Sequence, residues 1–300
     1  MPVHADLQPF LEEMKGGPPL SQIPIELLRD GSRLPRAEGA EMAEVTDRVL
    51  AGVPVRIYRP RAGAVLPVLV YFHGGGFVVG DLDTHDGGCR NLAAGADCLV
   101  VAVHYRLAPE HRFPAATDDC TAVARWVLQH AGEIGGDPGR VAVGGDSAGG
   151  NLAAVAALRL RDEGAAPLAG QLLVYPMSHM ASPVEGSMVS NGDGYFLRTP
   201  DITWFETTYL GDGADAAHPH ASPLLAKDHG RLPPALVITA EFDPLYDQGA
   251  RYHAKLTDAG VASTHSDYKG AIHGFFGMDS EPSRRAVAEA SAWLKRVFAT

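Results

Sequence analysis

The stretch Gly145-Asp146-Ser147-Ala148-Gly149 decides the fold that this sequence predicts. It follows an apolar run, Val141-Ala142-Val143, and precedes an Ala- and Leu-rich segment typical of a helix. A G-x-S-x-G turn between a strand and a helix is a nucleophile elbow, in which small flanking residues let the backbone turn sharply enough to expose the serine. The N-terminal end of the following helix favours negative charge there. Because serines in glycine-rich turns are common, the interpretation also requires a base, an acid and an oxyanion hole.

A candidate oxyanion hole lies earlier in the chain. His73-Gly74-Gly75-Gly76-Phe77 follows Val68–Phe72, a short run that is typical of a buried strand. Consecutive glycines expose backbone N–H groups without obstruction by side chains, so they can face a carbonyl oxygen as it becomes an oxyanion. A flexible glycine turn is the plain alternative. The G-x-S-x-G turn downstream favours the functional interpretation, with the N–H of Ala148 as a further donor.

The candidate acid and base follow two later strand-like runs. Asp243 comes after 235–240, and His273 comes after 263–268 and a short connection. A serine nucleophile needs a base to take its proton, and the base needs a carboxylate to orient it and stabilise its charged form. The chain order of this chemistry in α/β-hydrolases is Ser, Asp or Glu, then His. Ser147, Asp243 and His273 obey that order, and strand ends in an open α/β sheet meet at one edge.

Other histidines compete for the role of the base, because the chain has 13 of them. His218 and His220 flank Pro219, and an H-x-H pair can bind metal. No Asp, Glu or Cys stands at ligand spacing beside them, so the pattern favours a solvated loop and no metal site. His265 lies inside a predicted strand, where its side chain would point sideways instead of standing at the strand end.

Two carboxylates compete with Asp243 for the role of the acid. Asp247 begins a predicted helix that runs to Ala259, where a carboxylate caps the N-terminus. Glu241 is adjacent to the strand end and stays open as an alternative on position alone.

The motifs together resemble those of the hormone-sensitive-lipase family of bacterial esterases. Five stretches carry the resemblance, in the family's order, between about Val53 and the C-terminus: His73-Gly74-Gly75-Gly76-Phe77, Tyr105-Arg106-Leu107-Ala108-Pro109-Glu110, Gly145 to Gly150, Asp243-Pro244-Leu245 and His273-Gly274-Phe275. The resemblance implies a triad of Ser147, Asp243 and His273, and an oxyanion hole formed by N–H groups of Gly75, Gly76 and Ala148. It also implies that His73 supports the loop, that Tyr105–Glu110 is scaffold, and that a homodimer is compatible with the chain.

The predicted architecture is a single α/β-hydrolase domain with a mostly parallel, eight-stranded sheet flanked by helices and covered by a helical cap. Residues 45–58 form two antiparallel edge strands around Gly52, and strands then alternate with helices over 84–96, 115–129 and 148–161. N-terminal cap helices occupy residues 1–44, and the catalytic domain occupies 45–300. A cap insertion at about 177–217 interrupts the alternation. Its Trp204, Phe205 and Tyr209 either contact substrate or pack the cap on the body, and both interpretations stay open.

Composition narrows the class of protein. The 300 residues and the 46% apolar content suit one large α/β domain. A net charge of −11 argues against nucleic acid as a partner. The three cysteines form no metal or redox pattern, the N-terminal segment lacks the apolar core of a signal peptide, and no apolar run reaches the ~18 residues of a membrane span. These observations predict a cytoplasmic enzyme without a membrane span.

The predicted function is hydrolysis of small-molecule carboxylic esters with short to medium acyl chains, through an acyl-enzyme and without metal or organic cofactor. The acyl-chain range comes from the family resemblance alone. Two alternatives are an arylformamidase or amidase on the same scaffold, which would use the same triad, and a non-catalytic small-molecule receptor. The presence of Ser147, Asp243 and His273 speaks against the receptor.

Overall fold

An eight-stranded sheet forms the centre of the computed structural model, which describes residues 2–31, 38–180 and 182–300. The strand order is β1-β2-β4-β3-β5-β6-β7-β8. The strands are β1 (Glu44–Leu50), β2 (Val53–Arg59), β3 (Leu66–Phe72), β4 (Leu99–Val103), β5 (Gly136–Asp146), β6 (Gly170–Val174), β7 (Ala235–Phe242) and β8 (Ser263–Ile272). β2 is antiparallel to β1 and β4, and every other pair is parallel. The prediction of an eight-stranded, mostly parallel sheet with an antiparallel edge is confirmed.

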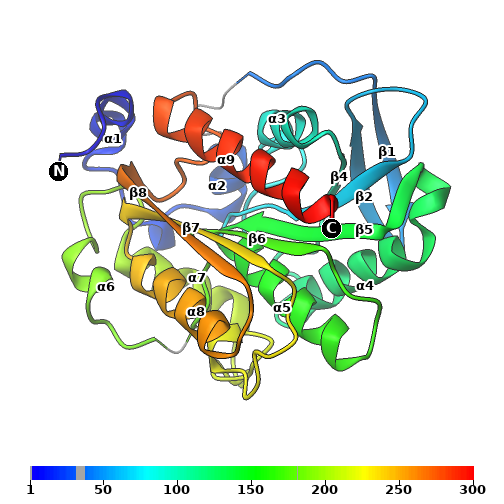
Figure 1. Cartoon of the computed structure of the whole chain (residues 1–300). Coiled ribbons are helices and arrows are strands. Elements are labelled where there is room, and N and C mark those ends of the chain that lie inside the picture. Colours follow the sequence, from blue (N-terminus) through cyan, green and yellow to red (C-terminus); the bar gives the residue numbers. More distant parts are fainter. Residues whose placement is uncertain (1, 32–37, 181) are drawn as a thin grey trace.

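Both faces of this sheet are covered, as the apolar runs of its central strands require. Successive side chains of a strand point to opposite faces, so Val68 and Val70 of β3 enter one core while Leu69 and Tyr71 enter the other. Helices α3 (Asp86–Ala96) and α9 (Glu281–Phe298) cover one face; α4 (Ala115–His130), α5 (Ala148–Asp162) and α8 (Tyr246–Asp258) cover the other (Figure 1). The helices predicted over 84–96, 115–129 and 148–161 are present with small shifts at their ends.

Two chain segments outside this layered body lie close to one end of the sheet. The N-terminal segment holds η1 (Ala5–Leu7), α1 (Gln8–Met14), η2 (Leu20–Gln22) and α2 (Ile25–Gly31). The later segment holds α6 (Ser187–Ser190) and α7 (Thr199–Leu210). The remaining short helices are η3 (Ala131–Ile134) and η4 (Pro223–Leu225). Residues 1 and 32–37 of the predicted N-terminal cap, and residue 181 of the predicted insertion, lie outside the described residues.

Among the helices that the structure describes, none has both the length and the apolar character needed to cross a membrane.

Candidate active site

The sharp turn between β5 and α5 places Ser147 at the end of the sheet. Ser147 has φ 57° and ψ −116°, an unusual backbone conformation for a residue other than glycine, and it stands at the N-cap of α5. The flanking glycines are needed because the backbone segments of this turn pack closely against each other and against the end of β3. A β-carbon on Gly149 would collide with the carbonyl oxygen of Phe72, and one on Gly145 would collide with the backbone of Gly149. The sequence therefore produces the elbow locally, as predicted.

Ser147, His273 and Asp243 form a continuous hydrogen-bonded relay. His273 Nε2 lies 2.9 Å from Ser147 Oγ, and His273 Nδ1 lies 2.7 Å from Asp243 Oδ2. The other carboxylate oxygen, Asp243 Oδ1, accepts a hydrogen bond from Leu245 N at 2.7 Å. Asp243 is fully buried at the end of β7, whereas Ser147 and His273 keep 8% and 5% exposure. This arrangement can transfer a proton from the serine to the imidazole and stabilise the imidazolium with a fixed, desolvated carboxylate.

The competing residues lie elsewhere. His265 Nε2 is 2.8 Å from Thr239 Oγ1 within the pair β7–β8, away from Ser147. Glu241 Oε2 accepts a hydrogen bond from Gly270 N at 2.8 Å, so this carboxylate supports the backbone of β8. Of the candidate acids, Asp243 is the one whose carboxylate contacts the His273 imidazole.

Asp247 lies in the first turn of α8, as predicted, but its carboxylate binds a different element. Asp247 Oδ2 accepts a hydrogen bond from Ser187 N, the first residue of α6, at 2.9 Å. The helix itself ends at Asp258, one residue before the predicted end. The expected capping of α8 by its own Asp247 is replaced by a tertiary contact, because Ser187 is brought alongside and also accepts, through Oγ, from Asp247 N.

The glycine-rich loop after β3 borders the same place. Gly75 and Gly76 have φ of 117° and 60°, and a side chain on either would collide with Val79 or Phe205 respectively. No acceptor among the residues described takes a hydrogen bond from the N–H of Gly75, Gly76 or Ala148. These three donors are therefore available to a ligand beside Ser147.

His73 supports this loop from behind. Its Nδ1 lies 2.7 Å from Gly74 O, its carbonyl accepts from Tyr105 Oη at 2.8 Å, and its ring stacks on Tyr105 at 4.2 Å. Burial lowers the pKa of His73 to about 3, so the imidazole is neutral at ordinary pH. These contacts agree with a supporting role for His73 and explain why a tyrosine begins the 105–110 motif.

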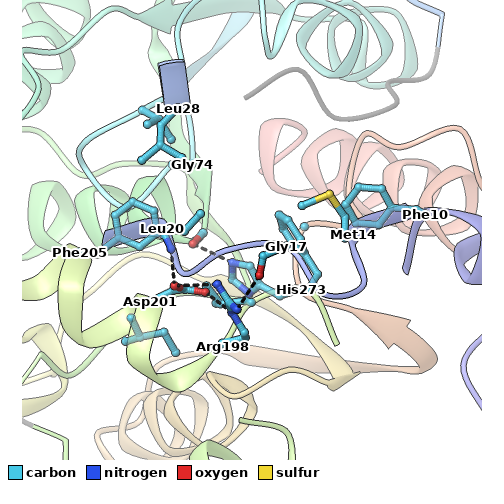
Figure 2. A pocket seen from close by; sticks show the side chains of 18 of the residues that line it. Phe10, Met14, Gly17, Leu20, Leu28, Gly74, Arg198, Asp201, Phe205 and His273 are labelled. Carbon is cyan, nitrogen blue, oxygen red and sulfur yellow. Dashed lines mark hydrogen bonds and ion pairs between the residues drawn. The ribbon is translucent and has the colours of Figure 1, made fainter. Parts of the chain in front are cut away.

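A cavity of about 1040 Å³ opens above Ser147 and His273. Its apolar lining comes from both outlying segments, including Phe10, Leu20 and Leu28 of the N-terminal segment and Phe205 of α7 (Figure 2). Figure 2 also places Phe205 and His273 around the same space. Cavities that are largely apolar with a few convergent polar groups are typical ligand sites.

The three aromatic residues left open by the sequence have different roles. Phe205 lines the cavity and packs against Gly76. Tyr209 instead stacks on Phe77 with ring centroids 3.9 Å apart, and its hydroxyl lies 3.0 Å from Thr117 Oγ1. Trp204 does not line the cavity and packs, partly buried, against the core. Phe205 is thus the one of the three placed to touch a ligand.

An ion pair on α7 holds the N-terminal segment over the cavity, and the sequence offered no signal for it. Arg198 Nε donates to Asp201 Oδ2 at 2.7 Å, Asp201 Oδ1 accepts from Leu20 N at 3.1 Å, and Arg198 donates to the carbonyls of Gly17 and Pro18 (Figure 2). We call Arg198 and Asp201 the cap clasp. It joins two segments that are about 180 residues apart in the chain.

A second contact missed from the sequence involves the end of the 105–110 motif. Arg29 of α2 makes two 2.8 Å hydrogen bonds to Glu110 and also donates to the carbonyls of Val78 and Ala108. The guanidinium lowers the pKa of Glu110 to about 2. The motif described as scaffold therefore also docks α2 beside the glycine-rich loop.

Within the part of the chain that the structure describes, no three His, Cys, Asp or Glu side chains gather as they would around a metal ion. His218 and His220 pack ring to ring with centroids 4.8 Å apart on a connection between α7 and η4.

Comparisons with known proteins agree with this geometry. A family model described as alpha/beta hydrolase fold matches residues 69–277. The chain is 44% identical over 263 residues to the esterase LipI of Mycobacterium tuberculosis, covering 84% of this chain and 82% of that protein. It is 44% identical over 236 residues to an ethyl acetate hydrolase of Pseudomonas putida, covering 76% and 73%.

The structure as a whole is similar to that of a hyperthermophilic esterase from the archaeon Pyrobaculum calidifontis. The TM-score is 0.94 at 38% sequence identity, with all of both chains covered. The likeness therefore includes the outlying segments as well as the sheet and its helices. Together with the elbow, the relay and the family match, it establishes that the chain belongs to the α/β-hydrolase fold family and, within it, to the hormone-sensitive-lipase family of bacterial esterases.

Proposed function

We propose that this protein is a serine carboxylic ester hydrolase that cleaves short- to medium-chain acyl esters through an acyl-enzyme. The observation that carries the proposal is the relay from Ser147 Oγ through His273 to the buried Asp243, at 2.9 and 2.7 Å. Nucleophile, base and orienting carboxylate within hydrogen-bond reach are the requirements of acyl transfer by serine.

In the first step, His273 Nε2 takes the proton of Ser147 as its oxygen attacks the ester carbonyl. Asp243 holds Nδ1 and stabilises the imidazolium. The oxyanion of the tetrahedral intermediate accepts hydrogen bonds from the N–H groups of Gly75, Gly76 and Ala148, which have no other acceptor among the described residues. Removing one donor of this kind typically raises the barrier by about 3 kcal/mol. His273 then protonates the leaving alcohol, and the acyl group remains on Ser147.

In the second step, water takes the place of the alcohol. His273 removes a proton from the water as it attacks the acyl-enzyme, the same three N–H groups hold the second oxyanion, and Ser147 recovers its proton as the acid leaves. In each half-reaction His273 acts first as a base and then as an acid, so no further catalytic group is needed.

The cavity supports an apolar substrate. We propose that residues 1–44 and the insertion at about 177–217 act together as a cap that closes over the ester and excludes water. The ethyl acetate hydrolase among the relatives acts, by its name, on a short-chain ester, which agrees with the proposed acyl range. The cap clasp joins the two parts of the cap to each other, and Arg29 ties α2 to Glu110 and to the carbonyl of Val78 beside the glycine-rich loop.

Two further expectations remain proposals. The three cysteines are buried and form no disulfide with one another, which supports a cytoplasmic location. A homodimer rests on family resemblance alone, and its test is sedimentation or light scattering of the purified protein.

The direct test is hydrolysis of p-nitrophenyl esters from acetate to palmitate by the wild type and by Ser147→Ala. We expect activity to peak at short or medium chains and to fall by about 10⁴-fold or more in the variant. Ser190→Ala, an exposed serine of α6, is the matched control and should match the wild type. Turnover that survives in a folded Ser147→Ala protein would identify another nucleophile. A folded wild type without ester hydrolysis would contradict the proposal.

A further inference from the structure

A second carboxylate lies beside the nucleophile and takes no part in the relay. Asp146, the residue before Ser147, is buried at the end of β5 with 7% exposure. Its Oδ1 accepts hydrogen bonds from Tyr71 Oη at 2.8 Å and from Gly74 N at 3.1 Å, and His85 Nε2 lies 3.5 Å away. Burying a carboxylate costs free energy, so its hydrogen bonds are expected to serve a function.

The contacts of Asp146 join the nucleophile's strand to the start of the glycine-rich loop. Tyr71 lies on β3, and Gly74 lies just beyond the end of that strand. A β-carbon on Gly74 would collide with the Asp146 carboxylate, so the carboxylate packs directly against the backbone of Gly74. Gly74 directly precedes Gly75 and Gly76, the proposed oxyanion donors. The direction of those N–H groups therefore depends on where Asp146 holds Gly74.

The negative charge of Asp146 lies close to the place where the oxyanion forms. A carboxylate near a developing oxyanion repels it, and the repulsion is strong in a site with little water. Among the described contacts, Tyr71 Oη and Gly74 N donate to Asp146 Oδ1. His85 Nε2 lies 3.5 Å from the same oxygen. Tyr71 keeps its proton, because burial and the nearby Asp146 raise its pKa well above the ordinary value. Gly74 supplies a backbone N–H, and His85 supplies a ring nitrogen from the cavity wall. These contacts to Oδ1 partly offset the negative charge beside the oxyanion.

We propose that Asp146 is a positioning residue of the oxyanion hole: its carboxylate holds Gly74 so that the N–H groups of Gly75 and Gly76 face the oxygen of the tetrahedral intermediate. This inference rests on the proposed ester hydrolysis. Asp146, the residue before the nucleophile, then sets the geometry of the oxyanion hole. Ser147 and the oxyanion donors are then set by one rigid unit, the end of β5.

The test distinguishes three effects of replacing Asp146: loss of the hydrogen-bond acceptor, loss of the negative charge, and loss of protein stability. Asp146→Ala removes the acceptor for Gly74 and Tyr71. Asp146→Asn keeps a carbonyl oxygen of nearly the same shape but removes the charge. Asp137→Ala is the control, because Asp137 lies at the other end of β5 and also accepts a backbone N–H, from Gly139 at 2.9 Å. Thermal unfolding of each variant shows whether the fold is kept.

Two kinetic measurements carry the test. The first is kcat and KM for p-nitrophenyl butyrate. The second is inhibition by phenylboronic acid, which forms a tetrahedral adduct on Ser147 and places a charged oxygen in the oxyanion hole. For Asp146→Ala we expect kcat to fall about 100-fold with KM within about 3-fold, since the lost interaction belongs to the transition state. Phenylboronic acid should bind at least ~10-fold more weakly. Asp146→Asn should recover kcat to within ~10-fold of the wild type.

The inference is overturned if Asp146→Ala keeps kcat within ~3-fold, or if Asp146→Asn is as damaging as Asp146→Ala, which would assign the effect to charge. If Asp146→Ala does not fold, Tyr71→Phe decides: removing one donor should lower kcat by ~3- to 10-fold and weaken boronate inhibition, and no change in either overturns the inference. These outcomes differ from failure of the proposed function, in which the wild type would neither hydrolyse the ester nor bind phenylboronic acid in a Ser147-dependent way.

Discussion

A partly buried carboxyl group in α7 makes the stability of this protein depend on pH. Glu206 lies on the helix that carries Phe205 into the cavity, and its Oε1 is buried without a hydrogen-bond partner among the described residues. Desolvation raises the pKa of Glu206 to about 8, from an ordinary value of 4.5. Between these values the folded state holds the proton and the unfolded state has lost it. The free energy of unfolding therefore falls as pH rises from about 4.5 to about 8.

The magnitude follows from the difference between the two pKa values. About 3.5 pH units at ~1.4 kcal/mol each give a ceiling of about 5 kcal/mol, reached above pH 8. The side chain is only partly buried as a whole, so solvent and local relaxation reduce the effect, and we expect about 2 kcal/mol. Glu206→Gln keeps the shape and removes the titration. The variant should therefore be more stable than the wild type at high pH, and the two proteins should differ least at pH 5.

Urea unfolding of both proteins at pH 5, 6, 7, 8 and 9 measures this difference. We expect the variant's advantage to grow from less than ~1 kcal/mol at pH 5 to ~2 kcal/mol at pH 9, following the ionisation of Glu206. Glu13→Gln, an exposed acid of α1, is the control and should show no such trend. A difference that is the same at every pH, or a variant less stable than the wild type at pH 9, would refute the reasoning.

Three further predictions concern activity. His273→Ala should lower kcat for p-nitrophenyl butyrate by about 10⁴-fold, while His265→Ala should stay within ~3-fold; equal losses would mean that the base is misassigned. Asp243→Asn should cost ~10²- to 10⁴-fold in kcat, and Glu241→Gln less than ~5-fold, because only the former orients the imidazole; steady-state kinetics would expose the opposite order. Arg198→Met removes half of the cap clasp and should raise KM by ~3- to 10-fold with a smaller change in kcat; an unchanged KM would show that the cap does not need it.

Much of the site could be predicted because its chemistry is concentrated in short stretches. The elbow around Ser147 needs small residues at fixed offsets, and the loop before Phe77 needs glycines that free its N–H groups. Both are local requirements of the backbone, so they are readable in the sequence. Chain order and strand ends were enough to bring Asp243 and His273 to the same edge of the sheet, because parallel strands all end there.

Long-range contacts could not be predicted, because a side chain's partner depends on how distant elements pack. The sequence left Glu241 open as the acid until the structure placed its carboxylate on Gly270 N. The same is true of Asp247, which was expected to cap its own helix and instead binds Ser187 N. Both contacts arise from tertiary neighbours that leave no signal in the local sequence.

The sequence by itself determined the α/β architecture, the nucleophile elbow and the places of Ser147 and His273 in the relay, because these follow from periodicity, glycine placement and chain order. The choice of Asp243 over Glu241 came from the resemblance to the family motif Asp243-Pro244-Leu245. Only the tertiary structure decided which cap aromatic faces the cavity, that Arg198 and Asp201 hold the N-terminal segment, and that Asp146 binds Gly74. The physical reason is that hydrophobic patterning sets which faces are buried, whereas the pairing of polar groups depends on distances between elements that meet only after the chain has folded.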